Sequence, residues 1–87
     1  MTKTSIISPD LSSEFSSQPQ QRRDVLITCA EDIEQVKTVI EKAGIRIVDQ
    51  MAELRILQAN IDYNDLVKLQ EIPSIDWIEI DEEAQAI

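Results

Sequence analysis

The chain has 87 residues with 17 acidic and 8 basic side chains, so its formal net charge at pH 7 is −9. This length suits one small domain, and the excess of acid opposes binding to nucleic acid or to an anionic membrane surface. With no histidine, one cysteine and one glycine, the sequence lacks the usual acid/base group, a thiolate metal cage and a glycine-rich phosphate loop, so we expect no enzyme, cofactor or metal site.

Residues 1–22 are rich in serine, glutamine and proline. Their apolar residues are few, and we assign their spacing to neither a helix nor a strand. A segment with so little to bury does not offset the entropy lost on ordering, so we predict a disordered tail. A short docking motif at Ile6 and Ile7 is the alternative. The sequence shows no signal peptide or membrane span, which favours a cytoplasmic protein and leaves a cleaved precursor as the alternative.

Residues 23–87 form the predicted domain, which begins with a β-branched run at 25–29 that we interpret as a strand. Cys29 alternates with apolar neighbours on this strand, so we expect a small buried side chain rather than a reactive thiol. A helix follows from Glu31, because carboxylates stabilise the positive end of the helix dipole. Gly44 is placed where the residue after a helix adopts a left-handed conformation, and it predicts the helix end.

Two further strands are predicted at 45–48, continuing toward Met51, and at 54–59, with a tight hairpin between them. Asp62, with an acidic residue three positions later, is typical of a helix N-cap and begins a short second helix that must end before Pro73. A fourth strand is expected at 75–81, followed by an extended tail at 82–87. The order β-α-β-β-α-β favours an α+β, ferredoxin-like two-layer sandwich, with a four-stranded antiparallel sheet and both helices on one face.

Alternation along the fourth strand places Ile75, Trp77, Glu79 and Asp81 on one face of the sheet. If the other face meets the helices, the single tryptophan lies on the uncovered face beside two carboxylates. One interpretation is that Trp77 covers part of the sheet and the acids are solvated. The other is a protein interface with an aromatic anchor, in which the acids cap the N-termini of a partner's helices.

Residues 24–87 resemble the propeptide domains of subtilisin-type serine proteases and the related free-standing inhibitors, such as the fungal proteinase B inhibitors. The segment 73–81 carries the resemblance: it begins Pro-Ser and then has an aromatic residue, an aliphatic residue, a Glu, any residue and an Asp. Gly44 and the helix between Asp62 and Pro73 also fall where the family has them. The resemblance covers about three quarters of the chain.

The resemblance implies an inhibitor or folding chaperone whose open sheet face packs on two surface helices of a subtilisin-like serine protease. Residues matching Glu79 and Asp81 meet the N-termini of those helices in this family. The C-terminal residues then lie as a strand in the protease cleft, with main-chain hydrogen bonds of the kind made in β-augmentation. The implied partner-binding residues beyond the fourth strand are Glu83, Ala84, Gln85, Ala86 and Ile87, with Ile87 in the first specificity pocket.

A function of a different class stays open. Ferredoxin-like folds serve many purposes, so the domain is alternatively a regulatory or oligomerisation module without protease inhibition. In that case the apolar sheet face is the interface of a homodimer.

Overall fold

Strand β1 (Arg23–Cys29) alternates buried and half-buried side chains, as a strand with one covered face does. Strand β3 (Ile56–Ile61) has the same alternation, and antiparallel pairing sets Val25 opposite Ala59 and Ile27 opposite Leu57. These two central strands therefore present one continuous apolar surface to the core. The computed structural model describes residues 6–82 of the chain.

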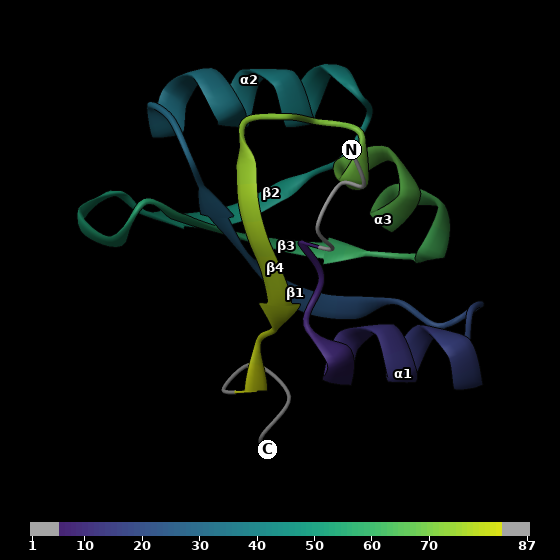
Figure 1. Cartoon of the computed structure of the whole chain (residues 1–87). Coiled ribbons are helices and arrows are strands. Elements are labelled where there is room, and N and C mark those ends of the chain that lie inside the picture. Colours follow the sequence, from purple (N-terminus) through teal and green to yellow (C-terminus); the bar gives the residue numbers. More distant parts are fainter. Residues whose placement is uncertain (1–5, 83–87) are drawn as a thin grey trace, which may run out of the picture.

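The sheet has the strand order β2-β3-β1-β4, with β2 at Ile47–Met51 and β4 at Ile75–Ile80, and all neighbouring strands are antiparallel. Helices α2 (Ile33–Lys42) and α3 (Tyr63–Gln70) cover one face of it (Figure 1). The predicted ferredoxin-like α+β fold, with the order β1, α2, β2, β3, α3, β4, is confirmed. The helices contribute to the core the buried side chains Ile33, Val36, Ile40, Leu66 and Leu69.

Local signals place the end of α2 and the start of α3 where they were predicted. Gly44 has a φ of 88°, a left-handed conformation that glycine adopts without strain, and it follows the end of α2. The Asp62 carboxylate accepts a hydrogen bond from the Asp65 backbone N–H at 2.8 Å, and the Asp65 carboxylate accepts one from the Asp62 N–H at 3.4 Å. This capping box begins α3.

The connection between β2 and β3 differs from the expected tight hairpin. Residues Ala52–Leu54 form a short 3₁₀ turn, η1, and Arg55 follows it with a φ of 56°. The connection is longer because the sequence lacks the Asn-Gly or Asp-Gly pair that a two-residue turn requires. As a result β3 spans Ile56–Ile61, two residues later than predicted.

The predicted disorder of residues 1–22 is wrong for residues 9–17, which form helix α1 (Pro9–Ser17). Ser8 caps this helix by accepting a hydrogen bond from the Leu11 N–H at 3.3 Å, and proline at the first helical position has the required φ already. Ile7, Leu11 and Phe15 are all buried, and their spacing of four residues puts them on one side of this segment. That spacing was the signal missed in the sequence.

Three contacts attach this N-terminal segment to the domain. Ile7 forms a parallel bridge with Ile78 at the outer edge of β4, with backbone hydrogen bonds of 2.7 and 2.9 Å on either side. Phe15 packs its ring 6.2 Å from that of Tyr63 at the start of α3. Arg23 pairs with Glu14 at 3.0 Å. The segment therefore completes the core beside β4 (Figure 1).

Candidate protein-binding face

The side of the sheet away from α2 and α3 has no helix on it among the described residues, and we call it the open face (Figure 1). In the register of the sheet, Leu26 of β1 lies opposite Gln58 of β3 on one side and Glu79 of β4 on the other. All the side chains of this face in the three strands are half-buried. They are Asp24, Leu26, Thr28, Ile56, Gln58, Asn60, Trp77 and Glu79.

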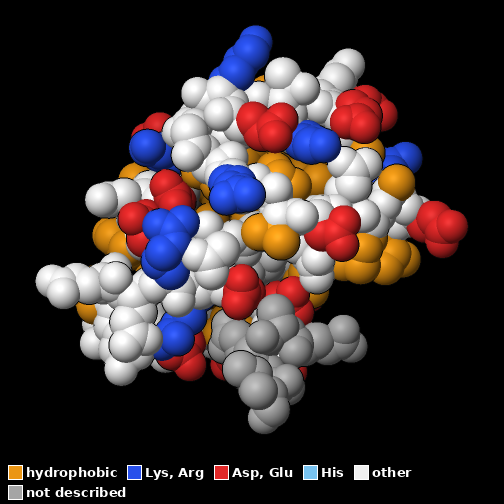
Figure 2. Space-filling view, turned by 180° about the vertical axis from the view of Figure 1, so that it is seen from behind, with side chains coloured by type: hydrophobic (Ala, Val, Ile, Leu, Met, Phe, Trp, Pro, Cys, Tyr) orange, Lys and Arg blue, Asp and Glu red, His pale blue; other side chains and the backbone are white. Residues whose placement is uncertain are grey.

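A shallow hollow of about 500 Å³ lies on the open face. Its apolar floor is formed by Leu26, Met51, Leu54 and Ile56, and the Leu54 side chain is 62% exposed. Seen from behind, hydrophobic and acidic side chains adjoin at the right of the surface, around the end of the β2–β3 hairpin (Figure 2). An exposed apolar floor of this kind is typical of a surface that another molecule covers.

Carboxylates border the same hollow on the side of β4. Glu79 is half-buried, Asp81 directly after the strand is buried, and Glu82 beside it is exposed. Ser8 and Asp10 of the N-terminal segment reach the hollow as well, since this segment lies along β4. Ser8 and Asp10 were not predicted to belong to the site, because their segment was expected to be disordered.

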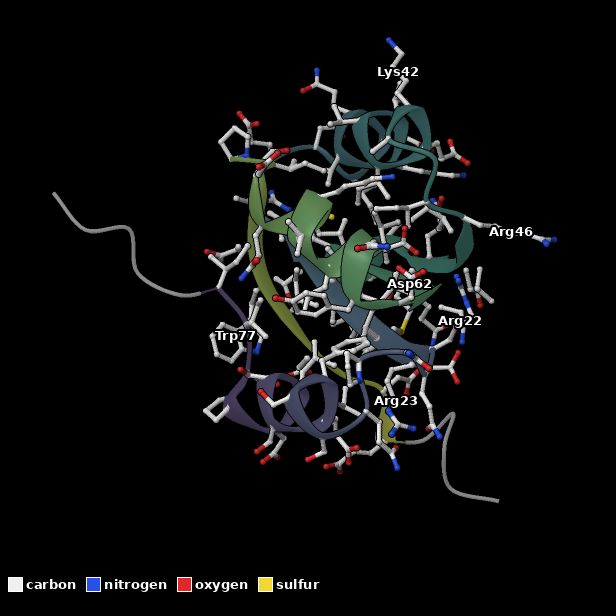
Figure 3. All side chains as sticks on the ribbon, turned by 90° about the vertical axis from the view of Figure 1, so that its right-hand side faces the viewer. Arg22, Arg23, Lys42, Arg46, Asp62 and Trp77 are labelled. Atoms are coloured by element: carbon white, nitrogen blue, oxygen red, sulfur yellow. The ribbon has the colours of Figure 1, made fainter. Side chains whose placement is uncertain are left out.

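Trp77 and Glu79 lie together on the open face, as the alternation predicted. The Trp77 indole N–H donates a hydrogen bond to the Glu79 carboxylate at 3.1 Å, and Trp77 lies opposite Thr28 of β1. The Trp77 side chain projects on the side of the molecule opposite to Arg22 and Arg46 (Figure 3). The indole therefore holds the Glu79 carboxylate in place on the open face.

Ile75 does not share the face of Trp77, which corrects the simple alternation. The register between β1 and β4 shifts after Thr28, so that Cys29 lies opposite Ile75 and Asp76 has no partner in the register. Ile75 is consequently buried and Asp76 is exposed. A bulge of this kind reverses the alternation, because one extra residue turns the strand by one position.

Asp81 occupies a different environment from Glu79. Its side chain is only 5% exposed, and its carboxylate accepts a hydrogen bond from the Gln58 side-chain amide at 3.0 Å. Its backbone N–H donates to the Asp24 carbonyl at 2.9 Å. The other predicted partner-binding residues, Glu83, Ala84, Gln85, Ala86 and Ile87, lie outside the described residues.

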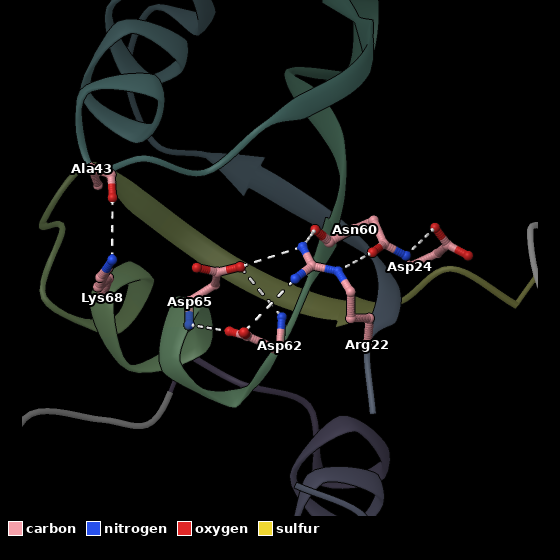
Figure 4. Close-up of polar contacts among 7 residues, drawn as sticks. All are labelled: Arg22, Asp24, Ala43, Asn60, Asp62, Asp65 and Lys68. Carbon is pink, nitrogen blue, oxygen red and sulfur yellow. Dashed lines mark hydrogen bonds and ion pairs between the residues drawn. The ribbon is translucent and has the colours of Figure 1, made fainter. Parts of the chain in front are cut away.

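A polar network that the sequence did not predict supports the end of the open face at which Asp24 lies (Figure 4). The Asn60 amide donates to the Asp24 carboxylate at 3.1 Å, and the Arg22 guanidinium donates to the Asn60 side-chain and backbone oxygens at 2.6 and 2.7 Å. Arg22 also forms ion pairs with Asp62 and Asp65 at 3.7 and 3.6 Å. The capping box of α3 is thereby connected to the strands of the open face.

The described residues contain little that suits covalent or metal chemistry. Burial raises the pKa of the Cys29 thiol from 9.0 to about 11, so the nucleophilic thiolate is disfavoured. Among residues 6–82, no group of three or more Cys, Asp and Glu side chains is arranged to hold a metal ion. What the open face offers is apolar contact, hydrogen-bond acceptors and negative charge, the means of noncovalent recognition.

Comparison of the chain with protein-family models and with curated proteins finds no match. Within the part of the chain that the structure describes, no helix is long and apolar enough to cross a membrane.

Proposed function

We propose that this protein is a binding module that inhibits a subtilisin-like serine protease through its open face and its C-terminal residues 83–87. The observation that carries the proposal is an apolar floor bordered by carboxylates at the end of β4, directly before those residues. The resemblance of segment 73–81 to protease propeptides supports the same assignment.

The chemistry of the open face fits a partner surface built from helix N-termini. Such N-termini present free N–H groups and the positive end of the helix dipole, both of which favour a carboxylate. Glu79 and Glu82 supply carboxylates that are accessible, and Leu26 and Leu54 supply apolar contact beside them. The C-terminal residues would add main-chain hydrogen bonds by lying as a strand in the protease cleft.

The test is inhibition of a purified subtilisin by the full chain and by a chain ending at Glu82. Loss of two or three main-chain hydrogen bonds, each contributing about 1 kcal/mol, corresponds to inhibition about a hundredfold weaker. Circular dichroism of both chains checks that the fold is retained. Failure of the full chain to inhibit any subtilisin-like protease at micromolar concentration would contradict the proposal, as would equal inhibition by both chains.

A matched pair of variants locates the contact. Leu54→Ala removes an exposed apolar side chain from the hollow, whereas Val67→Ala removes one from the outer side of α3. Burial of a leucine side chain contributes about 1.5–3 kcal/mol, so Leu54→Ala should weaken inhibition about tenfold or more. Val67→Ala should leave inhibition unchanged.

The second candidate is a regulatory or oligomerisation domain that uses the open face to form a homodimer. The exposed Leu54 and the apolar floor favour it, because a face of this kind is also typical of a dimer interface. The net charge of −9 opposes it, since two copies repel each other. Sedimentation distinguishes the two: a stable dimer in which Trp77 fluorescence is shielded from a quencher favours this second function.

A further inference from the structure

The two acids that follow Trp77 on β4 and just beyond it differ in their surroundings. Glu79 is half-buried on the open face and accepts its hydrogen bond from Trp77, a residue of the same strand. Asp81 is 5% exposed and accepts its hydrogen bond from Gln58, a residue of β3. Strand β1 lies between β3 and β4, so this hydrogen bond spans a strand of the sheet.

Two hydrogen bonds fix the position of Asp81, one to its side chain and one from its backbone. The Gln58 amide holds the carboxylate, and the Asp24 carbonyl accepts from the Asp81 backbone N–H. Asp24 is itself held by Asn60, which in turn is held by Arg22 at the capping box of α3. The Asp81 carboxylate thus accepts one charge-assisted hydrogen bond, and its backbone is joined through Asp24 to the rest of the network.

A carboxylate in this position is poorly placed to meet a partner. Facing another protein requires exposure, and the Asp81 carboxylate is already used within the domain. Asp81 also lines the hollow but is almost fully buried there, whereas Glu79 and Glu82 beside it are more exposed. The two kinds of acid are thus suited to different tasks.

We propose that Asp81 is a positioning residue, which Gln58 and Asp24 hold so that the end of β4 and Glu82 after it have one fixed position beside the hollow. The charge directed at the partner is supplied by Glu79 and Glu82 instead. This inference rests on the proposed function and assigns Asp81 a role different from the one its resemblance to protease propeptides implies. The role needs a hydrogen-bond acceptor at position 81 but no negative charge there.

Full-length variants separate these roles by inhibition of a subtilisin at low and at physiological salt. Asp81→Asn keeps an acceptor for Gln58 and removes the charge, Asp81→Ala removes both, and Gln58→Met removes the donor at similar size. Glu79→Gln is the matched control for a charge that faces the partner.

We expect Asp81→Asn to inhibit within about threefold of the original chain, with the same salt dependence. Asp81→Ala and Gln58→Met should each weaken inhibition about tenfold, and the double variant no further, because both remove one interaction. Glu79→Gln should weaken inhibition about threefold and reduce its salt dependence, since salt screens a charge at an interface. A loss in Asp81→Asn equal to that in Asp81→Ala, with reduced salt dependence, would overturn the inference.

Hydrogen exchange of the Asp81 backbone N–H tests, without any protease, whether Gln58 holds Asp81 in position. We expect faster exchange in Gln58→Met and Asp81→Ala than in Asp81→Asn, because the hydrogen bond to Asp24 opens when the side chain is released. Unchanged exchange in Gln58→Met would refute the positioning role of Asp81 even if the chain is an inhibitor. If exchange is faster in Gln58→Met but the original chain inhibits no protease, Gln58 still holds Asp81 and only the proposed function is refuted.

Discussion

Cys29 illustrates how burial alone determines the chemistry of a residue. Its side chain is 4% exposed at the end of β1, opposite Ile75 of β4, and burial raises its pKa to about 11. A charged thiolate in this apolar position would lose its hydration without gaining a partner of opposite charge. The side chain therefore acts as a small apolar group of the core, as the sequence predicted.

The raised pKa of Cys29 predicts a loss of stability in alkaline solution. Above pH 9 the unfolded chain loses the thiol proton while the folded chain keeps it, so the free energy of unfolding falls as the pH rises from 9.0 to about 11. A shift of this size corresponds to about 3 kcal/mol. Urea unfolding across this pH range measures the fall. In the Cys29→Ala variant, the part of the fall that is due to the thiol should be absent. An identical pH dependence of the free energy of unfolding in both chains would contradict the prediction.

At the scale of elements, α1 is the least expected part of the fold. Its sequence is mostly polar, yet Leu11 is 0% and Phe15 2% exposed, because the helix turns both toward the core. The adjoining bridge between Ile7 and Ile78 adds a strand-like contact at the edge of β4. A small domain buries a limited fraction of its surface, so a segment that adds two large apolar side chains contributes much of its stability.

Phe15→Ala should therefore destabilise the whole domain. Removal of a buried phenylalanine side chain costs about 3–5 kcal/mol, a large part of the total for a domain of this size. Ser16→Ala is the matched control, because Ser16 is the next residue of α1 and is exposed. Thermal unfolding followed by circular dichroism compares the two. Equal midpoints would mean that α1 does not support the core.

At the scale of the whole molecule, net charge opposes compactness. The charge of −9 is confined to a body with principal extents of 38 × 32 × 22 Å, so most acidic side chains lie within a few tens of ångströms of one another. Attractive pairs at Arg22 and Arg23 offset part of this repulsion. They are few, and surface pairs contribute about 0–1 kcal/mol each.

Sodium chloride should consequently stabilise the protein. The Debye length is about 30 Å at 0.01 M salt, comparable to the size of the molecule, and about 8 Å at 0.15 M, where only adjacent charges interact. We expect the thermal midpoint to rise over this range, because salt removes long-range repulsion first. A scanning calorimeter measures the midpoint. A fall with salt would show that the attractive pairs outweigh the repulsion.

Parts of the fold and of the site were accessible from the sequence because their causes are local. The β-branched run at 25–29 identified β1, the capping box at Asp62 identified the start of α3, and Gly44 marked the end of α2. Each signal is contained within a few residues, since caps and side-chain periodicity act over one or two turns. Alternation along the fourth strand placed Trp77 and Glu79 on one face.

What only the tertiary structure decided depends on residues far apart in the chain. The hydrogen bond that buries Asp81 joins residues 23 positions apart, and the one between Arg22 and Asn60 joins residues 38 apart. The bulge opposite Thr28 is likewise a matter of how β4 pairs with β1. The sequence by itself determined the four strands, the helices α2 and α3, their order and the acidic character of the chain. Packing and pairing decided that Asp81 is buried against Gln58 and that α1 joins the core, because the burial of a side chain is a property of its neighbours in space.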